Sequence, residues 1–313
     1  RFYFRQRGAD GLSRALEFFE LAVARDPGYA DAYTGIADVY GQMPLYSATP
    51  FDSILPLALR SVSRAIAIDS TLAGAYVSRG GLLNSAWQWS EAERDLRRAI
   101  TIDPSNPTAH QWFGENLLLN GRIAEAAVEF EDAAELDPLS PVNTALLGIA
   151  LALSGDQEAA VERGKRAVEL DPLAPVARFM LGAIYLYVGQ YANAIPEFEN
   201  ARELAPRVAT VHGLLGYAYA VTGQTNRAIS VLQSIDSTDV TTGNAAAIAR
   251  IYLGLSDSDA ALLWLDRAAD AHDPFFGSEP LASPLFDPLR DDPRFADVLK
   301  KANLDQAALV SGQ

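Results

Sequence analysis

The side chains best suited to chemistry in this sequence are three histidines, His110, His212 and His272. An imidazole can act as a general base or as a metal ligand near neutral pH. Either role needs a partner, and neither His110 nor His212 has a histidine or a carboxylate three or four residues further on. His272 precedes Asp273 at an expected helix end, where a cation is favourable. We therefore predict that the histidines pack or cap helices and bind no metal.

A short acidic run, SDSD at 256–259, could suggest a calcium site, but it lacks the glycine and the distal glutamate of an EF-hand loop. It precedes a helical apolar pattern, so helix N-capping explains it better. The chain has no cysteine, which excludes disulfides, thiolate catalysis and cysteine zinc sites. It also has no phosphate-binding loop, HExxH or GxSxG motif. The sequence thus predicts a protein that is not an enzyme and uses no cofactor.

Charge and hydropathy indicate which classes of partner the chain can bind. The 313 residues include 40 acidic and 25 basic ones, a formal net charge of −15. Basic residues gather only in pairs such as Arg97–Arg98 and Lys300–Lys301, so a phosphate backbone is repelled. The most apolar run, 142–153, is too short for a hydrocarbon core of roughly 30 Å. We expect neither nucleic-acid binding by this segment nor membrane insertion.

The elements that must position any site repeat every 34 residues. Small residues and helix breakers recur in columns, among them Ala58, Ala92, Ala126, Ala160, Ala194 and Ala228; Gly80, Gly114, Gly148, Gly182 and Gly216; Gly121, Gly155, Gly189 and Gly223; and Pro104, Pro138, Pro172 and Pro206. A period of this length is typical of stacked repeats.

Each column has a physical role in a pair of helices. Small residues let the two helices approach closely, with larger neighbours such as Phe130 and Phe198 filling the gaps. The glycine column at Gly121 ends the first helix because glycine tolerates positive φ. The Asp-Pro pairs end the second helix, because the residue before proline avoids the α region. One pair cannot bury its apolar face alone, so the units must stack.

These columns resemble the tetratricopeptide repeat (TPR) family. The resemblance implies an all-α fold, a right-handed α-α superhelix (TPR solenoid) of six to seven repeats. We expect one solenoid over 1–313, made of an N-terminal helix in 1–29, six units in 30–240, a divergent seventh in 241–274 and a C-terminal cap in 275–313. The cap would bury one side of a short amphipathic helix formed by Phe295, Val298, Leu299 and Leu304.

The first full unit departs from the period. Ala37 and Ala58 are 21 residues apart, against 12 for Gly114 and Ala126, so nine extra residues lie near 42–51. Two readings stay open for this insertion: a surface loop, or a recognition or dimer contact.

The resemblance also implies a concave groove lined by the first helix of each unit. The groove residues that we expect to contact a partner are Gln111, Glu115, Leu118, Ile149, Phe179, Ala183, Leu186, Tyr187 and Tyr217. No Lys or Arg occupies a groove position, so clamping of a chaperone's terminal carboxylate is not expected. The wall changes from polar to apolar along the chain, which suits an apolar or amphipathic segment. Alternatively, the chain's own C-terminal segment or tight superhelical curvature covers it.

Three further stretches indicate a more specific resemblance within the TPR family. They are FELAVARDPGYADAYTGIADVY, SAWQWSEAERDLRRAITIDPSNPTAHQWFGENLL and ALLWLDRAADAHDP. With the C-terminal signature they resemble the TPR half of bacterial signalling proteins that carry a winged-helix, nucleotide-cyclase or serine/threonine-kinase domain. This resemblance implies a regulatory module cut from a longer protein. It places the module in the cytoplasm or, alternatively, on the extracytoplasmic side of a membrane-tethered regulator.

Three functions therefore compete. The first is a scaffold that binds a protein or peptide partner in the groove. The second is a sensor of a small apolar ligand, with Gln111, Trp112 and Glu115 as polar contacts. The third is a structural homodimer joined through the insertion or an open end of the array.

Overall fold

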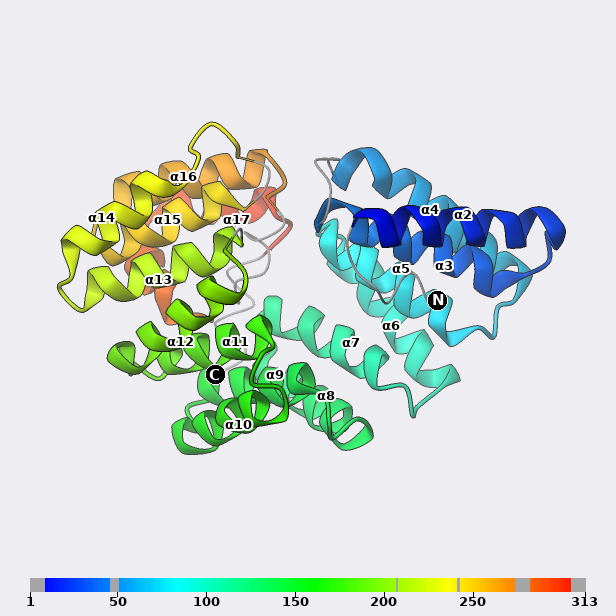
Figure 1. The fold of residues 1–313 in the computed structure, drawn as a ribbon, viewed down its shortest axis with the longest axis horizontal. Helices are drawn as coiled ribbons and strands as arrows, with labels where there is room; N and C mark the ends of the chain where they lie inside the picture. Colours follow the sequence, from blue (N-terminus) through cyan, green and yellow to red (C-terminus); the bar gives the residue numbers. More distant parts are fainter. Residues whose placement is uncertain (1–8, 46–50, 207, 241–242, 274–281, 305–313) are drawn as a thin grey trace. The chain divides into compact units, whose positions relative to one another are not determined.

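The computed structural model describes residues 9–45, 51–206, 208–240, 243–273 and 282–304, and every regular element in these ranges is a helix (Figure 1). The chain divides into two compact units, 1–116 and 117–313, and the division falls within a helix, α7 (Pro107–Leu119).

Unit 1 is built of helix pairs. An N-terminal helix, α2 (Ala9–Arg25), packs on α3 (Ala30–Gln42). Helix α3 pairs with α4 (Phe51–Ile68), and α5 (Ala73–Ser85) pairs with α6 (Trp89–Ile102). Helices α3 and α5 also pack directly on each other. The first helices of consecutive pairs therefore form one layer of the unit.

Unit 2 continues the same plan. Its helices are α8 (Ile123–Leu136), α9 (Pro141–Leu153), α10 (Gln157–Leu170), α11 (Pro175–Tyr187), α12 (Tyr191–Leu204), α13 (Ala209–Val221), α14 (Thr225–Ser234), α15 (Asn244–Gly254), α16 (Ser258–Asp270) and α17 (Pro293–Lys301). Helix α9 packs on α10, α11 on α12, and α15 on α16. Together with the solved structures compared below, this repeated pairing confirms the predicted all-α TPR solenoid fold.

The helix ends follow the sequence signals. Gly121, Gly155, Gly189 and Gly223 have φ of 79°, 91°, 76° and 78°, the left-handed conformation that stops the first helix of each pair. Asp137 and Asp171, each followed by proline, are the C-cap residues of α8 and α10. These stops recur at one spacing, so successive pairs are alike.

The small-residue columns bring the helices into contact. Ala126, Ala160 and Ala194 are completely buried, as are Phe130 and Phe198. Larger side chains fill the space that glycine leaves open: a Cβ atom on Gly182 would lie 2.7 Å from Cε1 of Phe198. The columns therefore mark close helix–helix contacts, as the sequence predicted.

The sixth pair differs from the others. Helix α14 has 10 residues, against 14 in α12, and α15 packs mainly on α13. A Cβ atom on Gly213 would lie 2.7 Å from Cα of Ala247, and one on Gly254 would lie 2.9 Å from the carbonyl oxygen of Tyr217. Two first helices thus touch backbone to backbone at this place.

The insertion in the first pair is partly helical. Helix α4 begins at Phe51 and has 18 residues, against 14 in α6, while a 3-10 turn at Met43–Leu45 follows α3. Residues 46–50, the middle of the insertion, lie outside the described residues, so both readings of the insertion stay predictions.

The C-terminal segment packs on the last pair. A 3-10 helix at Pro284–Leu289 contacts α15 and α16, and α17 packs on α16. The rings of Phe286 and Phe295 lie 5.2 Å apart, and the four apolar side chains named for the cap are all buried. Lys301 on α17 forms an ion pair of 2.6 Å with Asp266 on α16. The segment covers the apolar end of unit 2, as a cap does.

Candidate functional site

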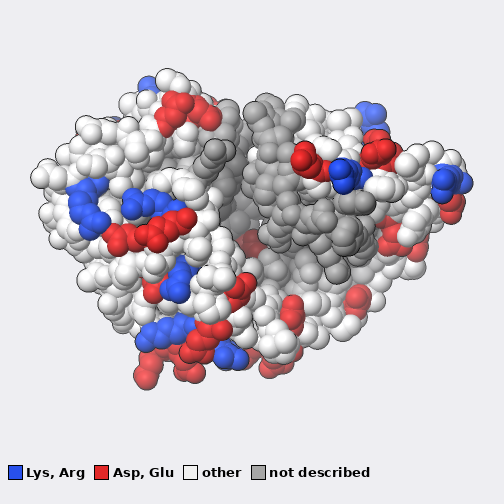
Figure 2. Space-filling view, viewed as in Figure 1, with Lys and Arg blue, Asp and Glu red and all other residues white. Residues whose placement is uncertain are grey.

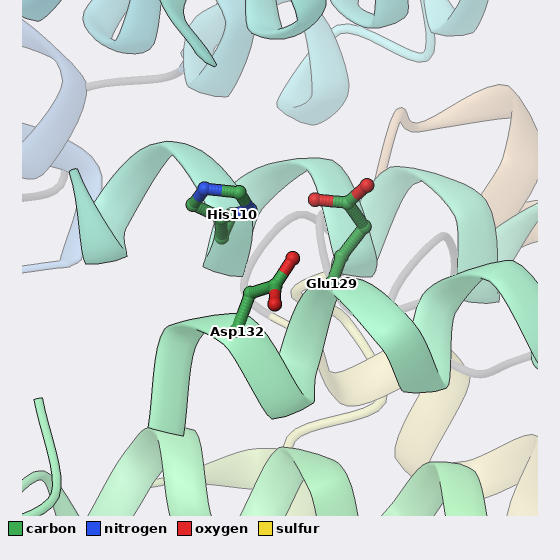
Figure 3. Close-up of side chains that lie close together, drawn as sticks. All are labelled: His110, Glu129 and Asp132. Atoms are coloured by element: carbon green, nitrogen blue, oxygen red, sulfur yellow. The ribbon is translucent and has the colours of Figure 1, made fainter. Parts of the chain in front are cut away.

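His110 is buried, and its Nε2 lies 3.0 Å from the carbonyl oxygen of Pro104. Figure 3 shows it with Glu129 and Asp132, whose ligand atoms lie within 4.8 Å of its own and of one another. The sequence search missed this group because it looked three and four residues along one helix, whereas both carboxylates belong to α8. The Pro104 carbonyl can only accept, so Nε2 of His110 carries the ring proton and Nδ1 is left as the acceptor nitrogen.

Of the other two histidines, His212 packs between helices and His272 is exposed at a helix end. His212 on α13 is partly buried, and this burial lowers its pKa, with a further contribution from the nearby Arg202. His272 follows the end of α16 with a φ of 49°, in the left-handed region. The acidic run contributes a helix cap: Oδ1 of Asp257 accepts a hydrogen bond from the Ala260 amide at 3.0 Å. The N-capping prediction is confirmed.

The nine predicted groove residues fall into two classes. Leu118, Ile149, Ala183, Leu186 and Tyr217 are buried, whereas Gln111, Glu115, Phe179 and Tyr187 are half-buried. All of the buried ones belong to unit 2. A buried side chain offers a partner no surface to contact.

Local packing accounts for part of this burial. The Phe179 ring lies 6.0 Å from the ring of Phe198 on α12, so it packs within its own repeat. Tyr217 lies at the close contact of α13 with α15 and 6.5 Å from the Tyr191 ring. The close approach of α13 and α15 therefore accounts for part of the burial of Tyr217.

Unit 1 presents a different surface on its layer of first helices. We name the partly exposed residues on this layer the α3–α5–α7 wall: Asp38, Ser78, Gly81, Gln111, Trp112 and Glu115. Ser78 donates a hydrogen bond of 2.5 Å to Oδ1 of Asp38, which joins α5 to α3. A Cβ atom on Gly81 would touch the Trp112 indole at 3.5 Å, which joins α5 to α7.

Buried asparagines fix these helices beneath the wall. Nδ2 of Asn116 donates to Oδ1 of Asn84 at 2.7 Å and to the Trp89 carbonyl at 3.0 Å. Nδ2 of Asn84 donates to the Trp112 carbonyl at 3.2 Å. Amide networks of this kind hold a helix in one register because each buried group needs its partner. Sequence reasoning missed Asn116 and Ser78, since neither stands at a groove position of the family pattern.

The carboxyl of Glu115 on this wall has a shifted pKa. Burial of the carboxyl raises its pKa to about 7, and a hydrogen bond of 2.9 Å from Nε2 of Gln111 opposes this shift. The residue keeps part of its surface exposed even so. Near neutral pH the wall therefore carries a carboxyl close to its titration point, with one amide donor beside it.

Acidic and basic side chains lie side by side on the surface drawn in Figure 2. On the face drawn in Figure 2, coloured basic side chains lie beside acidic ones and form no continuous basic patch. Many are paired, among them Arg178 with Glu197 at 2.9 Å and Arg227 with Glu199 at 2.6 Å. Within the described ranges, no helix combines the length and hydropathy needed to cross a bilayer.

Two models of the tetratricopeptide repeat match the chain, over residues 87–141 and 185–251. No curated protein matches the sequence. Among solved structures, the Cut9–Hcn1 complex of the APC/C gives a TM-score of 0.61 at 19% identity, covering 93% of this chain and 52% of that one. A TPR protein from Parabacteroides merdae gives 0.59 at 15%, covering 79% and 93%. The pilus biogenesis factor PilW gives 0.55 at 21%, covering 66% and 91%.

The chain spans about half the length of the Cut9–Hcn1 chain that it matches. At these identities the solved structures establish the fold, and the two repeat models establish the kind of repeat that builds it. TPR proteins generally mediate protein–protein interactions. The chain therefore contains tetratricopeptide repeats within a TPR solenoid fold.

Proposed function

We propose that this chain is a non-catalytic interaction scaffold that holds a segment of a partner protein against the α3–α5–α7 wall. The observation that carries the proposal is the contrast between the two units. The predicted groove residues of unit 2 are mostly buried, whereas Ser78, Gln111 and Glu115 on the first helices of unit 1 are only half-buried. A wall of hydrogen-bonding side chains on rigid helices suits an extended peptide, whose backbone has unsatisfied donors and acceptors.

The rigidity of the wall supports this proposal. The asparagine network and the bidentate ion pair of Arg79 with Asp95 fix α5 against its neighbours, with N–O distances of 2.5 and 2.8 Å in the pair. A site whose side chains are held in place loses less conformational entropy when it binds. An apolar contact with a partner stays a proposal for the half-buried Phe179 and Tyr187.

Site-specific photo-crosslinking tests the proposal. A benzoylphenylalanine in place of Ser85, an exposed residue on α5 beside the wall, is expected to capture a discrete protein in cells of the source organism. The matched control places the same group at Leu263, an exposed residue on α16. Capture at both positions, or at neither, would contradict a partner site on the wall.

We further propose that the partner is part of a bacterial signalling system and that the chain acts in the cytoplasm. The support is the resemblance of three long stretches of this sequence to the TPR halves of such regulators. Mass spectrometry of the captured protein tests it. Capture of a cyclase, kinase or DNA-binding regulator, or of a protein that such a domain acts on, is the expected outcome. A cell-envelope protein would refute the assignment.

A further inference from the structure

Unit 2 carries a row of exposed apolar side chains at the turns that join one helix pair to the next. The row consists of Leu136, Leu139, Leu173, Val176, Leu204 and Val208, and we name it the turn ridge. Leu139 and Leu173 are 74% and 76% exposed, more than any other large apolar side chain in the described residues. Exposed apolar rows on a folded protein mark contact surfaces more often than isolated exposed residues do.

The two most exposed leucines of the ridge recur with the repeat. The segments 135–142 and 169–176 read ELDPLSPV and ELDPLAPV, so Leu139 and Leu173 occupy the same position of successive turns. Leu204 lies two repeats after Leu136, and Leu170 between them is half-buried. Val208 lies in the third turn. The corresponding turn of unit 1, 101–108, reads TIDPSNPT and has serine where the ridge has its exposed leucines. The ridge is therefore a property of these three turns and not of every repeat.

No structural role explains these side chains. The turns are already closed by backbone hydrogen bonds, such as Ser140 N to Asp137 O at 3.1 Å and Ala174 N to Asp171 O at 3.2 Å. Helix α9 is capped by Ser140, whose Oγ accepts from the Asn143 amide. A polar residue at position 139 or 173 would keep all of these bonds, since none of them involves the side chain of Leu139 or Leu173.

Charge around the ridge indicates its occupant. The segments 135–142, 169–176 and 203–210 contain five carboxylates, Glu135, Asp137, Glu169, Asp171 and Glu203, and one arginine, Arg207. All five acidic residues are exposed. The nearby Arg166 forms an ion pair with Glu169 at 3.1 Å. Arg207 lies outside the described residues. An apolar row within an acidic frame is complementary to a cationic amphipathic segment.

The same charge argues against a second copy of this chain. Two ridges face to face would bring together ten carboxylates, on chains that each carry a formal net charge of −15. A partner with lysines and arginines beside its apolar residues neutralises the frame while covering the leucines. A cationic protein segment is thus favoured over self-association.

Repeat geometry indicates the spacing that such a partner needs. Helices α9 and α11 pack directly on each other, and packed helices have axes about 8–10 Å apart. Successive turns of the ridge should be separated by a similar distance. Seven residues of an α-helix rise about 10.5 Å, so apolar residues seven apart on a helix match successive turns. We propose that the turn ridge binds a cationic amphipathic helix with apolar residues at heptad spacing.

A designed helical peptide of three heptads, with leucines seven apart and lysines beside them, is the probe. We expect the full chain to bind it, by fluorescence anisotropy, with a Kd below about 100 μM, an affinity within reach of a small apolar contact. Binding should weaken as salt is raised, because the frame acts through charge. The same peptide with glutamates for lysines should not bind.

The double variant Leu139→Ser and Leu173→Ser should raise the Kd at least tenfold and leave the thermal melt unchanged, since both side chains are exposed. The matched control is Leu263→Ser, at a leucine 52% exposed on α16, which should bind as the parent does. Absence of binding by the parent, equal losses in both variants, or equal binding of the acidic peptide would overturn the proposal. So would a parent dimer in light scattering that the double variant dissociates.

Discussion

The hydroxyl of Tyr219 on α13 donates a hydrogen bond of 2.5 Å to Oε1 of Glu199 on α12. Arg227 on α14 donates to the same carboxylate oxygen at 2.6 Å, and its guanidinium lies 3.9 Å from the centre of the tyrosine ring. Three consecutive helices are joined by this one group of side chains. Such a group stabilises the stack of repeats and not the individual helices.

We expect the stabilising effect of this group of side chains to be lost at alkaline pH. Burial raises the pKa of Tyr219 to about 12, and the hydrogen bond to Glu199 adds to this shift. Its folded pKa lies above the ordinary value of 10.0, so its contribution is complete below pH 10 and is lost as pH rises towards 12. Tyr219→Phe should remove this pH dependence and cost about 1 kcal/mol at pH 7. Denaturant unfolding at pH 7 and above pH 10 measures the loss of stability and its pH dependence. Tyr29→Phe, at a half-exposed site, is the control.

A second prediction concerns two glycines in equivalent helices. Gly182→Ala would place a Cβ atom 2.7 Å from the buried ring of Phe198. Overpacking of this kind costs about 1–3 kcal/mol. Gly74→Ala places its Cβ atom in open space, with nothing within 4 Å, and should gain up to about 1 kcal/mol by restricting the unfolded chain. Urea unfolding of the two variants should show opposite signs, and equal effects would contradict the packing described for Gly182.

The third prediction tests the wall through Glu115. The pKa of this carboxyl is raised from 4.5 to about 7 by burial. A carboxyl with a raised folded pKa contributes stability that is complete below 4.5 and is lost as pH rises through 7. Glu115→Gln should therefore gain stability relative to the parent between pH 4.5 and 8. The exposed Glu131→Gln is the control and should show no such trend. A parent and variant that differ equally at both pH values would refute the shift.

A fourth prediction addresses the C-terminal cap. Phe295 is completely buried and lies 5.2 Å, ring to ring, from Phe286. Phe295→Ala should destabilise the protein by about 3–5 kcal/mol, as for other buried aromatic truncations. Phe18→Ala, at a ring 53% exposed on α2, is the matched control and should change stability by about 0.5 kcal/mol or less. Calorimetry of both variants decides whether the cap is part of the cooperative fold, because a loosely docked segment would leave the melt unchanged.

The repeat signals in the sequence predicted the fold because each acts over a few residues. A glycine such as Gly155 ends a helix by its own backbone preference, and a pair such as Asp137–Pro138 does so through a steric clash with its neighbour. The small residues in register, such as Ala126 and Ala160, indicated which faces meet. Local chemistry repeated at one period is enough to specify stacked helix pairs.

The exposure of the predicted groove residues could not be read from the sequence, because exposure depends on how neighbouring pairs pack. Leu186 and Tyr217 stand at groove positions of the family pattern, yet they are buried. Helices α13 and α15 touch backbone to backbone through Gly213 and Gly254. The 34-residue pattern of the sequence does not predict this contact. The helix between them, α14, has 10 residues.

By itself, then, the sequence determined the all-α repeat fold, the positions of the helix ends and the absence of any thiol chemistry. Only the tertiary structure decided which first helices keep an accessible polar surface and that Asn84 and Asn116 join under it. It alone also showed that Leu139 and Leu173 stay exposed. The physical reason is range: helix ends depend on a few neighbouring residues, whereas burial depends on side chains tens of residues away in the chain.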